Sequence, residues 1–525
     1  MVIVNCRPHD LPAVSGNRLY LDYISGAGAA RQFFMHAPTD LAGAYRRRRR
    51  DVYPRRLVVD RLKTYQQELH AGRRALQNVE DLARPDTFCV VTGQQAGFLG
   101  GPAYTTFKIV TAIRWCERLQ GMFGGRFVPI FWLATEDHDL AEINHTYFLR
   151  PDGKVGRVKF GWQDEGCPIS RLPVTREVRK AYAGYFQSLT PGPGWEQARA
   201  LFAAGDDEWF ALWQARFWSQ LFSAQGLVVV EPRILRQPAC DFLVSTLEQA
   251  GEIRRRLVEV AQRLERAGYA PALDPRLNGG LFTFDRRGRR VRVDDPAAHI
   301  DLCAAHPDRY STDAALRPLM ADLVLPTLVS VLGPGEIAYQ GMLKPLYELF
   351  DLAQPVLAPR KSYTVLGRSD AEALSRYGSG VEAILSESLD FDAVFRRLVP
   401  APDLQMFSTA RAGVEAALAP LEAYLTAIDP NLGRTWEQTV AYALRNVTKL
   451  EKKALKARMS QLGFSRRQLG ALCNGIYPRG RLQERVFPLP HFINRFGLAF
   501  VDRLDEAGEL DDFSHHVLVM EDGDG

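Results

Sequence analysis

Three apolar runs in the first half of the chain alternate with polar or glycine-containing segments. Residues 88–92 (FCVVT), 127–135 (FVPIFWLAT) and 226–231 (GLVVVE) are short, continuous and rich in β-branched or aromatic side chains, which is typical of strands buried on both faces. A glycine-rich turn and a helical pattern over residues 104–119 separate the first two runs. This succession predicts a βαβ unit, and hence an α/β fold with a Rossmann-like parallel sheet.

Similar patterns continue to about residue 370. Two further strands are predicted at residues 324–332 and 354–359, and a β-hairpin with a basic tip at residues 281–293. Helical spacing of apolar positions predicts helices over residues 58–82, 208–222 and 240–268. An apolar run near the end predicts a last strand over residues 516–520.

Beyond residue 370 the apolar positions follow a heptad spacing. One series consists of Val414, Leu418, Leu421, Leu425 and Ile428, and a second of Trp436, Val440, Ala443, Val447, Leu450, Ala454 and Ala457. Steps of three and four residues predict two helices of a coiled coil. The second helix is strongly basic, which suits either a solvated face or a contact between two copies of the chain.

These patterns divide the chain into four parts. We expect an N-terminal helical segment packing on the core, a Rossmann-like core with insertions at about 150–205 and 275–310, a helical coiled-coil arm, and a C-terminal segment returning to the core. The corresponding ranges are 1–85, 86–370, 371–460 and 461–525.

Composition agrees with a globular, multidomain protein. Of the 525 residues 46% are hydrophobic and 24% charged, which excludes wholesale disorder. Seven scattered cysteines without a CxxC pair indicate reduced thiols in a cytoplasmic protein, and no secretory signal or membrane span is visible. The net charge of +5 is mild, and we interpret the five arginines at 46–50 as a solvated helix end, so neither nucleic acid nor a membrane is an expected partner.

The glycine-rich turn after the first strand is a candidate binding loop. It runs from Gly93 to Gly101 and contains Gln94, Gln95 and Gly97. Glycines allow close approach of a backbone to a ligand, and open α/β sheets bind ligands where strands end. The pattern is neither GxGxxG nor a P-loop, so it predicts no particular nucleotide; a tight structural turn is the alternative interpretation.

The second strand ends in the candidate catalytic cluster Glu136, Asp137, His138 and Asp139. Crowded carboxylates around one imidazole suit a general base, or hydrogen bonds to an amine or polyhydroxy ligand. A helix N-cap would explain Asp137 or Asp139 alone.

A metal site is a further alternative for this cluster. His138, Glu142 and His145 would lie on roughly one face if the segment were helical. HExxH is absent and no further ligand is identifiable, so we expect no metal.

A third strand end, GPGEIAY, contributes Glu336 and Tyr339, which suit hydrogen bonds to a sugar or an amino acid. Further candidate binding residues, for carboxylate, phosphate or polar contacts, are Asn144, Arg317, Lys344 and Arg360.

Four segments resemble the bacillithiol biosynthesis cysteine-adding enzyme family. They are VTGQQAGFLGGPAYTTFK, PIFWLATEDHDLAEINH, LRPLMADLVLPT with GPGEIAYQGMLKPLY, and IYPRGRLQER. The resemblance implies a Rossmann-like core with a coiled-coil domain used in dimerisation. It implies a ligase that joins L-cysteine, through its carboxyl group, to the glucosamine amine of glucosaminyl-malate. An activating nucleotide such as ATP would be natural on such a core.

The resemblance also assigns roles to residues of this chain. It implies that the ligand-cradling loop consists of Gly93, Gln94, Gln95 and Gly97. It implies that the polar site for the sugar amine consists of Glu136, Asp137, His138 and Asp139. It implies that Glu336 and Tyr339 contact the substrate. Two alternatives stay open: a metal-dependent amidase or deacetylase, and a non-catalytic coiled-coil partner protein with a nucleotide-binding core.

Overall fold

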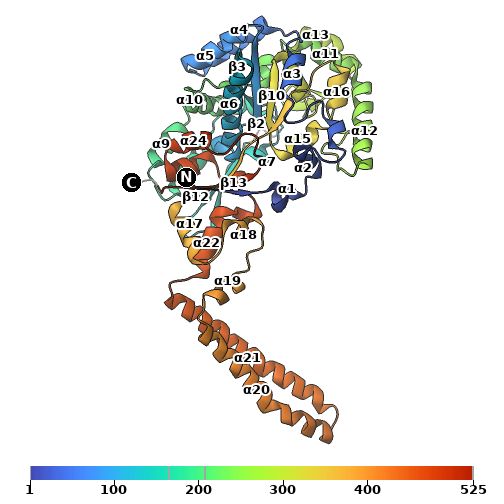
Figure 1. Ribbon diagram of the computed structural model, residues 1–525. Helices are drawn as coiled ribbons and strands as arrows, with labels where there is room; N and C mark the ends of the chain where they lie inside the picture. Colours follow the sequence, from blue (N-terminus) through green and yellow to red (C-terminus); the bar gives the residue numbers. More distant parts are fainter. Residues whose placement is uncertain (1, 163–165, 206–207, 523–525) are drawn as a thin grey trace. The chain divides into compact units, whose positions relative to one another are not determined.

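The computed structural model describes residues 2–162, 166–205 and 208–522, and divides into two compact units (Figure 1). The core unit comprises Met1–Pro151, Val155–Gly367 and Pro478–Gly525. The helical unit comprises Asp152–Lys154 and Arg368–Tyr477. Residues 461–477, expected with the C-terminal segment, therefore belong to the helical unit.

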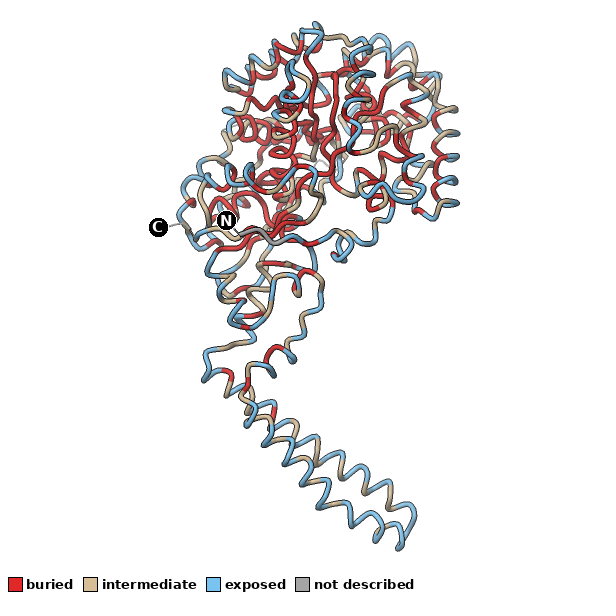
Figure 2. Tube along the Cα trace, in the orientation of Figure 1, coloured by how far each residue is buried: buried red, intermediate tan, exposed pale blue. Residues whose placement is uncertain are grey.

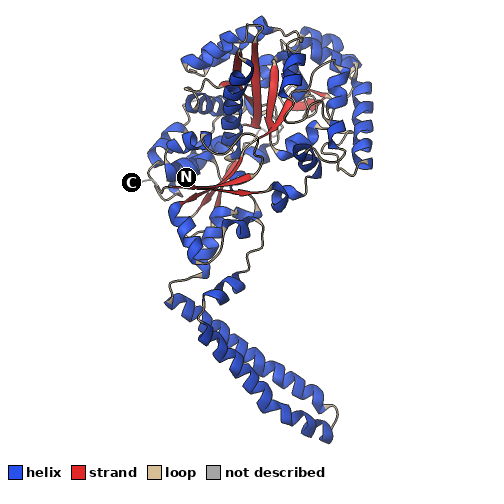
Figure 3. Ribbon diagram, in the orientation of Figure 1, coloured by secondary structure: helices blue, strands red, loops and turns tan. Residues whose placement is uncertain are grey.

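A five-stranded parallel sheet forms the centre of the core unit, with helices around it (Figure 3). Its strand order is β11-β10-β2-β3-β6, with bounds Val356–Pro359, Thr327–Leu332, Thr87–Gln95, Arg126–Ala134 and Val228–Val230. All neighbouring pairs are parallel. The chain builds β2, β3 and β6 in one direction and then returns to add β10 and β11 on the other side of β2. This is the doubly wound Rossmann order, and its switch point lies between β2 and β10.

Side-chain alternation along β3 explains why both faces of the sheet are covered. Val128, Ile130 and Trp132 belong to the hydrophobic cluster on one face. Phe131 and Leu133 belong to the cluster on the other face, where α6 (Tyr104–Phe123) contributes buried side chains. A strand buried on both faces needs a continuous apolar run, which is the pattern of residues 127–134.

A second, three-stranded sheet joins the two ends of the chain. β1 (Val2–Cys6) pairs antiparallel with β13 (His515–Met520), which pairs parallel with β12 (Ser362–Gly367). The predicted strand at 516–520 is confirmed. The N-terminal segment, expected to be helical, contains helices but begins with a strand that completes this sheet.

Two smaller sheets lie in the insertions of the core unit. The predicted basic hairpin is confirmed as β7 (Leu281–Phe284) and β8 (Arg290–Arg292), extended by β9 (Ser311–Thr312). β4 (His145–Leu149) and β5 (Val155–Lys159) form a second antiparallel pair.

Two predicted helices are each divided in the structure. Residues 58–82 fall into α4 (Arg55–Glu68) and α5 (Arg73–Asp81), because His70 has a φ of +52°, outside the helical region. Residues 240–268 fall into α11 (Cys240–Glu248) and α12 (Ala250–Arg266).

The strand predicted at 324–332 begins later than expected. α14 (Arg317–Val324) includes its first residue, and β10 begins at Thr327. Pro326 disfavours helical backbone at the residue before it, so the helix ends there. The predicted helix at 208–222 is confirmed as α10 (Phe210–Leu221).

The other helices of the core unit connect and cover the sheets. They are α1 (Pro12–Ser15), α2 (Arg18–Ser25), α3 (Leu41–Arg48), α7 (Leu140–Ile143), α8 (Arg176–Gln187), α9 (Trp195–Leu201), α13 (Ile300–Ala305), α15 (Pro334–Gln340), α16 (Lys344–Leu349), α23 (Leu489–Phe496) and α24 (Ala499–Asp505). Within the described ranges, none of the helices is long and apolar enough to cross a membrane.

The helical unit contains the predicted pair of long helices. α20 (Ala401–Ile428) and α21 (Leu432–Gln461) lie side by side, and the Trp436 indole donates a hydrogen bond to the Leu418 carbonyl at 2.9 Å. Figure 2 shows that this helical hairpin is mostly exposed. The shorter helices of the unit are α17 (Arg368–Arg376), α18 (Val381–Leu385), α19 (Phe391–Leu398) and α22 (Arg466–Ile476).

The turn between β2 and α6 requires glycine at position 97. A Cβ on Gly97 would lie 2.7 Å from the Gly101 Cα, so one backbone segment would have to move. We expect Gly97→Ala to lower the free energy of unfolding by about 1–3 kcal/mol. Gly121→Ala, within α6, meets no atom within 4 Å and should raise it by about 0.5–1 kcal/mol. Urea unfolding measures the free energy of unfolding of both variants. If Gly97→Ala and Gly121→Ala changed it by the same amount, the steric explanation would be contradicted.

Candidate active site

A cavity of about 450 Å³ opens at the carboxyl ends of the central strands. Side chains from β2, β3, β10, α14 and α15 line it, together with residues between 277 and 290. It therefore lies at the switch point, where open α/β sheets bind ligands. Seven predicted site residues line it: Gly93, Gln94, Gln95, Asp137, Arg317, Glu336 and Tyr339.

The end of β2 is held by a buried lysine of α6. Lys108 is 1% exposed, and its Nζ donates to the Gly93 carbonyl at 2.8 Å and to Gln94 Oε1 at 3.0 Å. It also pairs with Glu336 Oε2 at 2.5 Å. Burial lowers the pKa of Lys108, and the negative charge of Glu336 opposes this effect.

The four residues of the predicted catalytic cluster separate in the structure. Glu136 is 1% exposed and accepts hydrogen bonds from Arg236 Nε and Nη2 at 2.9 and 2.7 Å. Asp139 is exposed, and its Oδ1 caps α7 by accepting from the Ala141 amide at 3.0 Å. Glu136 therefore lies in a buried ion pair and Asp139 on the surface; neither lines the cavity.

Asp137 is the member of the cluster that lines the cavity. Its Oδ1 lies 2.7 Å from Arg317 Nη2 and 3.8 Å from Arg290 Nη1, and its Oδ2 accepts from Gln95 Nε2 at 3.3 Å. Burial opposes ionisation of Asp137, but the two arginines outweigh it and lower the carboxyl pKa. A carboxylate held in its charged form is a weak base, so this geometry favours a role in orienting Gln95 and Arg317.

His138 is exposed next to the cavity, with its ring centroid 6.3 Å from that of Phe282, a lining residue. The helix face proposed for His138, Glu142 and His145 is wrong, because α7 is one turn long and His145 begins β4. In the described part of the chain, no group of three or more His, Cys, Asp or Glu side chains could hold a metal ion.

Three further predicted residues lie elsewhere. Gly97 belongs to the turn described above. Asn144 caps the end of α7, and its carbonyl accepts from the Phe160 amide at 3.1 Å. Lys344 begins α16, and its Nζ donates to the Gln32 carbonyl at 3.0 Å. None of the three lines the cavity.

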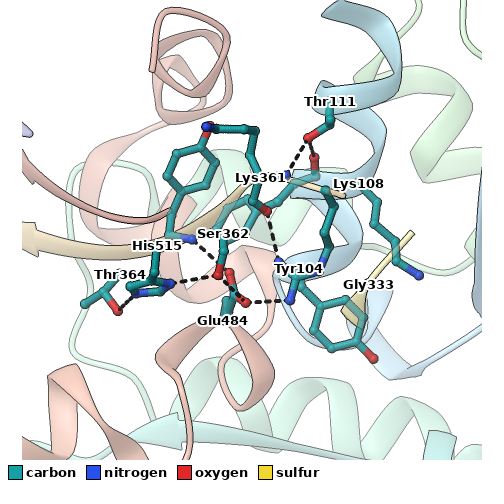
Figure 4. A network of polar contacts seen from close by, with 12 residues as sticks. Tyr104, Lys108, Thr111, Gly333, Lys361, Ser362, Thr364, Glu484 and His515 are labelled. Carbon is teal, nitrogen blue, oxygen red and sulfur yellow. Dashed lines mark hydrogen bonds and ion pairs between the residues drawn. The ribbon is translucent and has the colours of Figure 1, made fainter. Parts of the chain in front are cut away.

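Arg360 does not line the cavity; it belongs to a buried polar network that includes Ser362, Glu484 and His515, which Figure 4 shows close together. Its Nη2 pairs with Glu484 Oε1 at 2.5 Å, and the same oxygen accepts from Ser362 Oγ at 2.9 Å. Burial lowers the pKa of His515 to about 4, so this imidazole is neutral at pH 7. Since the Ser362 hydrogen is used on Glu484, His515 Nδ1 must donate to Ser362 Oγ at 2.7 Å, and His515 cannot act as a base toward that serine.

Three charged residues of this region belong to no sequence motif: Asp322 and Arg290, which line the cavity, and Lys108, which contacts two lining residues. Lys108 and Asp322 are charged residues within apolar helices, and only the need to pair a buried charge points to them. Arg290 belongs to the basic hairpin, whose side-chain alternation does not reveal that Arg290 faces the cavity.

Asp313 holds one wall of the cavity in place. Its Oδ2 accepts from the amides of Gly279 and Gly280 at 2.6 and 2.8 Å, and its Oδ1 from those of Ala315 and Leu316 at 3.0 and 3.1 Å. Four backbone donors on one carboxylate fix the segment that includes the lining residue Asn278.

This fold and this cavity define a Rossmann-like protein with a cavity lined by charged residues at the switch point of its sheet, and with a coiled-coil unit. The chain belongs to the bacillithiol biosynthesis BshC family. Residues 6–361 match the family's N-terminal Rossmann-like domain and residues 363–520 its C-terminal coiled-coil domain.

Curated relatives match over most of the chain. Proteins named "Putative cysteine ligase BshC" from Geobacillus thermodenitrificans and Geobacillus kaustophilus are 28% and 29% identical, each over 97% of this chain and 99% of the relative. One of the same name from Symbiobacterium thermophilum is 28% identical over 89% of this chain and 90% of its own length.

Asp322 should make stability depend on pH. It is 3% exposed and accepts from the Tyr347 hydroxyl at 2.5 Å, and burial raises its pKa from 3.8 to about 6, against the opposing effect of Arg48. Because the folded pKa is raised, the stabilisation is full below pH 4 and is lost as the pH rises through 6. Asp322→Asn removes this titration.

We expect the free energy of unfolding of Asp322→Asn, relative to the unaltered chain, to rise by up to about 3 kcal/mol between pH 4 and pH 7. Urea unfolding at several pH values measures this difference. Asp60→Asn, at an exposed position of α4, should show no such rise. A difference that stays constant across this pH range would contradict the assignment.

Proposed function

We propose that the chain is a ligase that joins L-cysteine, through its carboxyl group, to the glucosamine amine of glucosaminyl-malate, the last step of bacillithiol biosynthesis. Family membership and the names of relatives that match most of the chain support cysteine ligation. The structural observation that carries the proposal is the group of Arg290, Arg317 and Asp137 in the cavity.

This group suits an anionic amino sugar. Two guanidinium groups face one carboxylate, so these three residues together carry one positive charge. Malate has two carboxylates, and arginine binds carboxylates through paired N–H donors. The Gln95 amide, held by Asp137 through its nitrogen, turns its oxygen toward an N–H or O–H donor of the sugar.

Amide formation from a carboxylate needs a leaving group on the carboxyl carbon. We expect a nucleoside triphosphate such as ATP to supply it as a co-substrate. The amine nitrogen then attacks that carbon, the C–N bond forms, and the leaving group departs with the electron pair of its C–O bond. The nitrogen gives its proton to a base. The lowered pKa of Asp137 makes it a weak base, so His138 at the cavity rim is our candidate.

Purified protein, L-cysteine, glucosaminyl-malate and ATP test the proposal, with mass spectrometry of the product. We expect bacillithiol to form only with ATP present. Arg317→Met should lower kcat/KM for glucosaminyl-malate by about tenfold or more, since it removes a charge-assisted contact. His138→Ala should lower kcat. Arg255→Met, at an exposed ion pair of α12, is the matched control and should change neither.

Absence of the amide product with all three substrates present would contradict the ligase. Product formation unchanged by Arg317→Met would keep the reaction and remove the assigned sugar site. Cells lacking the chain should accumulate glucosaminyl-malate and lose bacillithiol.

We further propose that two copies associate through the helical hairpin. It exposes large apolar side chains at Tyr424, Ile428 and Tyr442, with exposed fractions of 65%, 61% and 65%. Serine at these three positions should shift sedimentation from dimer to monomer, whereas Met122→Ser, an exposed residue of the core unit, should not. A monomeric unaltered chain would contradict the proposal.

A further inference from the structure

Lys108 places two groups of the cavity next to each other. Its buried ammonium contacts both Gln94 Oε1 and Glu336 Oε2, at 3.0 and 2.5 Å. Figure 4 shows Tyr104 and Lys108, one helical turn apart on α6, beside Gly333. Gln94 and Glu336 come from the ends of the paired strands β2 and β10, and Lys108 contacts the side chains of both.

The contact also fixes which atoms Gln94 offers to a ligand. An ammonium group only donates, so the amide oxygen must face Lys108 and the amide nitrogen must point away. One hydrogen of Nε2 is used on the Tyr104 hydroxyl at 3.0 Å. The second remains for a ligand, so Gln94 presents a donor to an acceptor such as a carboxylate oxygen.

Glu336 offers the opposite polarity. Its Oε2 accepts from Lys108 and from the Gly333 amide at 2.7 Å, where it caps α15. Both contacts use the same oxygen, which leaves Oε1 for a ligand. A carboxylate oxygen accepts only, and it suits an ammonium group.

The local charges suit a zwitterion. Lys108 and Glu336 neutralise each other, and a ligand with one ammonium and one carboxylate adds no net charge. The guanidinium carbons of Arg360 and Arg485 lie 5.2 and 5.7 Å from the Tyr104 ring centroid. Arg360 is paired with Glu484, so Arg485 supplies the positive charge on the Tyr104 side of Gln94, where the carboxylate would bind.

We propose that Gln94 and Glu336 form the subsite for the amino acid substrate, with the carboxylate on Gln94 Nε2 and the ammonium on Glu336 Oε1, and that Lys108 is its positioning residue. This inference rests on the proposed ligase. Gln95, with Asp137 and Arg317, lines the same cavity and serves the amino sugar, so the two substrates meet there.

Three small thiols separate the two contacts by calorimetry on the full chain: L-cysteine, cysteamine, which lacks the carboxylate, and 3-mercaptopropionate, which lacks the ammonium. Glu336→Gln should weaken binding of L-cysteine and cysteamine by about tenfold or more and leave 3-mercaptopropionate within about twofold. Gln94→Glu keeps the acceptor for Lys108 but removes the donor. It should weaken L-cysteine and 3-mercaptopropionate and leave cysteamine unchanged.

Lys108→Met should weaken L-cysteine more than either single variant. If Lys108→Met fails to fold, Glu336→Gln and Gln94→Glu still test the subsite. Failure of the unaltered chain to bind an α-amino acid, or equal effects of both variants on all three thiols, would overturn the subsite.

The subsite and the ligase can fail separately. If L-serine shows the same pattern and no cysteinyl amide forms, the subsite stands and the proposed function falls. If the amide forms and both variants leave the KM for L-cysteine unchanged, the function stands and the subsite falls.

Discussion

The ammonium group of Lys108 connects the end of β2 to the start of α15 through three oxygen atoms. A buried cation without oxygen partners would cost several kcal/mol, so each N–H must find an acceptor. The Gly93 carbonyl, the Gln94 amide and the Glu336 carboxylate therefore cannot move independently. The end of β2 and the start of α15 therefore form one connected wall of the cavity. Because Lys108 is positively charged, the oxygens of this wall face it, and this determines which groups are left to donate to or accept from a ligand.

The same constraint recurs around the carboxyl ends of the strands. Asp137 with Arg317, Glu136 with Arg236, and Arg360 with Glu484 each place a carboxylate against a guanidinium in a buried or half-buried setting. Replacing such pairs by apolar residues often leaves stability unchanged or improves it, so their presence is better explained by geometry than by stability. Each pair fixes the direction of a donor or an acceptor. Together they give the switch point a fixed arrangement of charge before any ligand arrives.

The sequence predicted the elements that depend on local periodicity. Apolar runs predicted β2 and β3, and heptads predicted the helical hairpin, because burial on both faces and coiled-coil packing each impose a regular spacing. Strand ends then indicated Gln94, Asp137 and Glu336 as candidate site residues, and all three line the cavity. Adjacency in sequence misled within the acidic cluster, since successive residues after β3 point to different surroundings. Lys108 was missed because a contact made across 228 residues to Glu336 leaves no local pattern.

The chain leaves the core unit after β12 and returns at Pro478. Hydrogen bonds join the core residues on either side of this excursion. The Val365 amide donates to Gln483 Oε1 at 2.8 Å, and Gln483 Nε2 donates to the Val365 carbonyl at 2.9 Å. The segment Arg368–Tyr477 of the helical unit is thus an insertion, and the core residues that flank it are hydrogen-bonded to each other. Because the entropy of closing a loop grows only slowly with its length, heptads can be added to or removed from both long helices during evolution while the core unit keeps its strand pairing. In this architecture the length of the helical hairpin can therefore change without altering the residues of the cavity in the core unit.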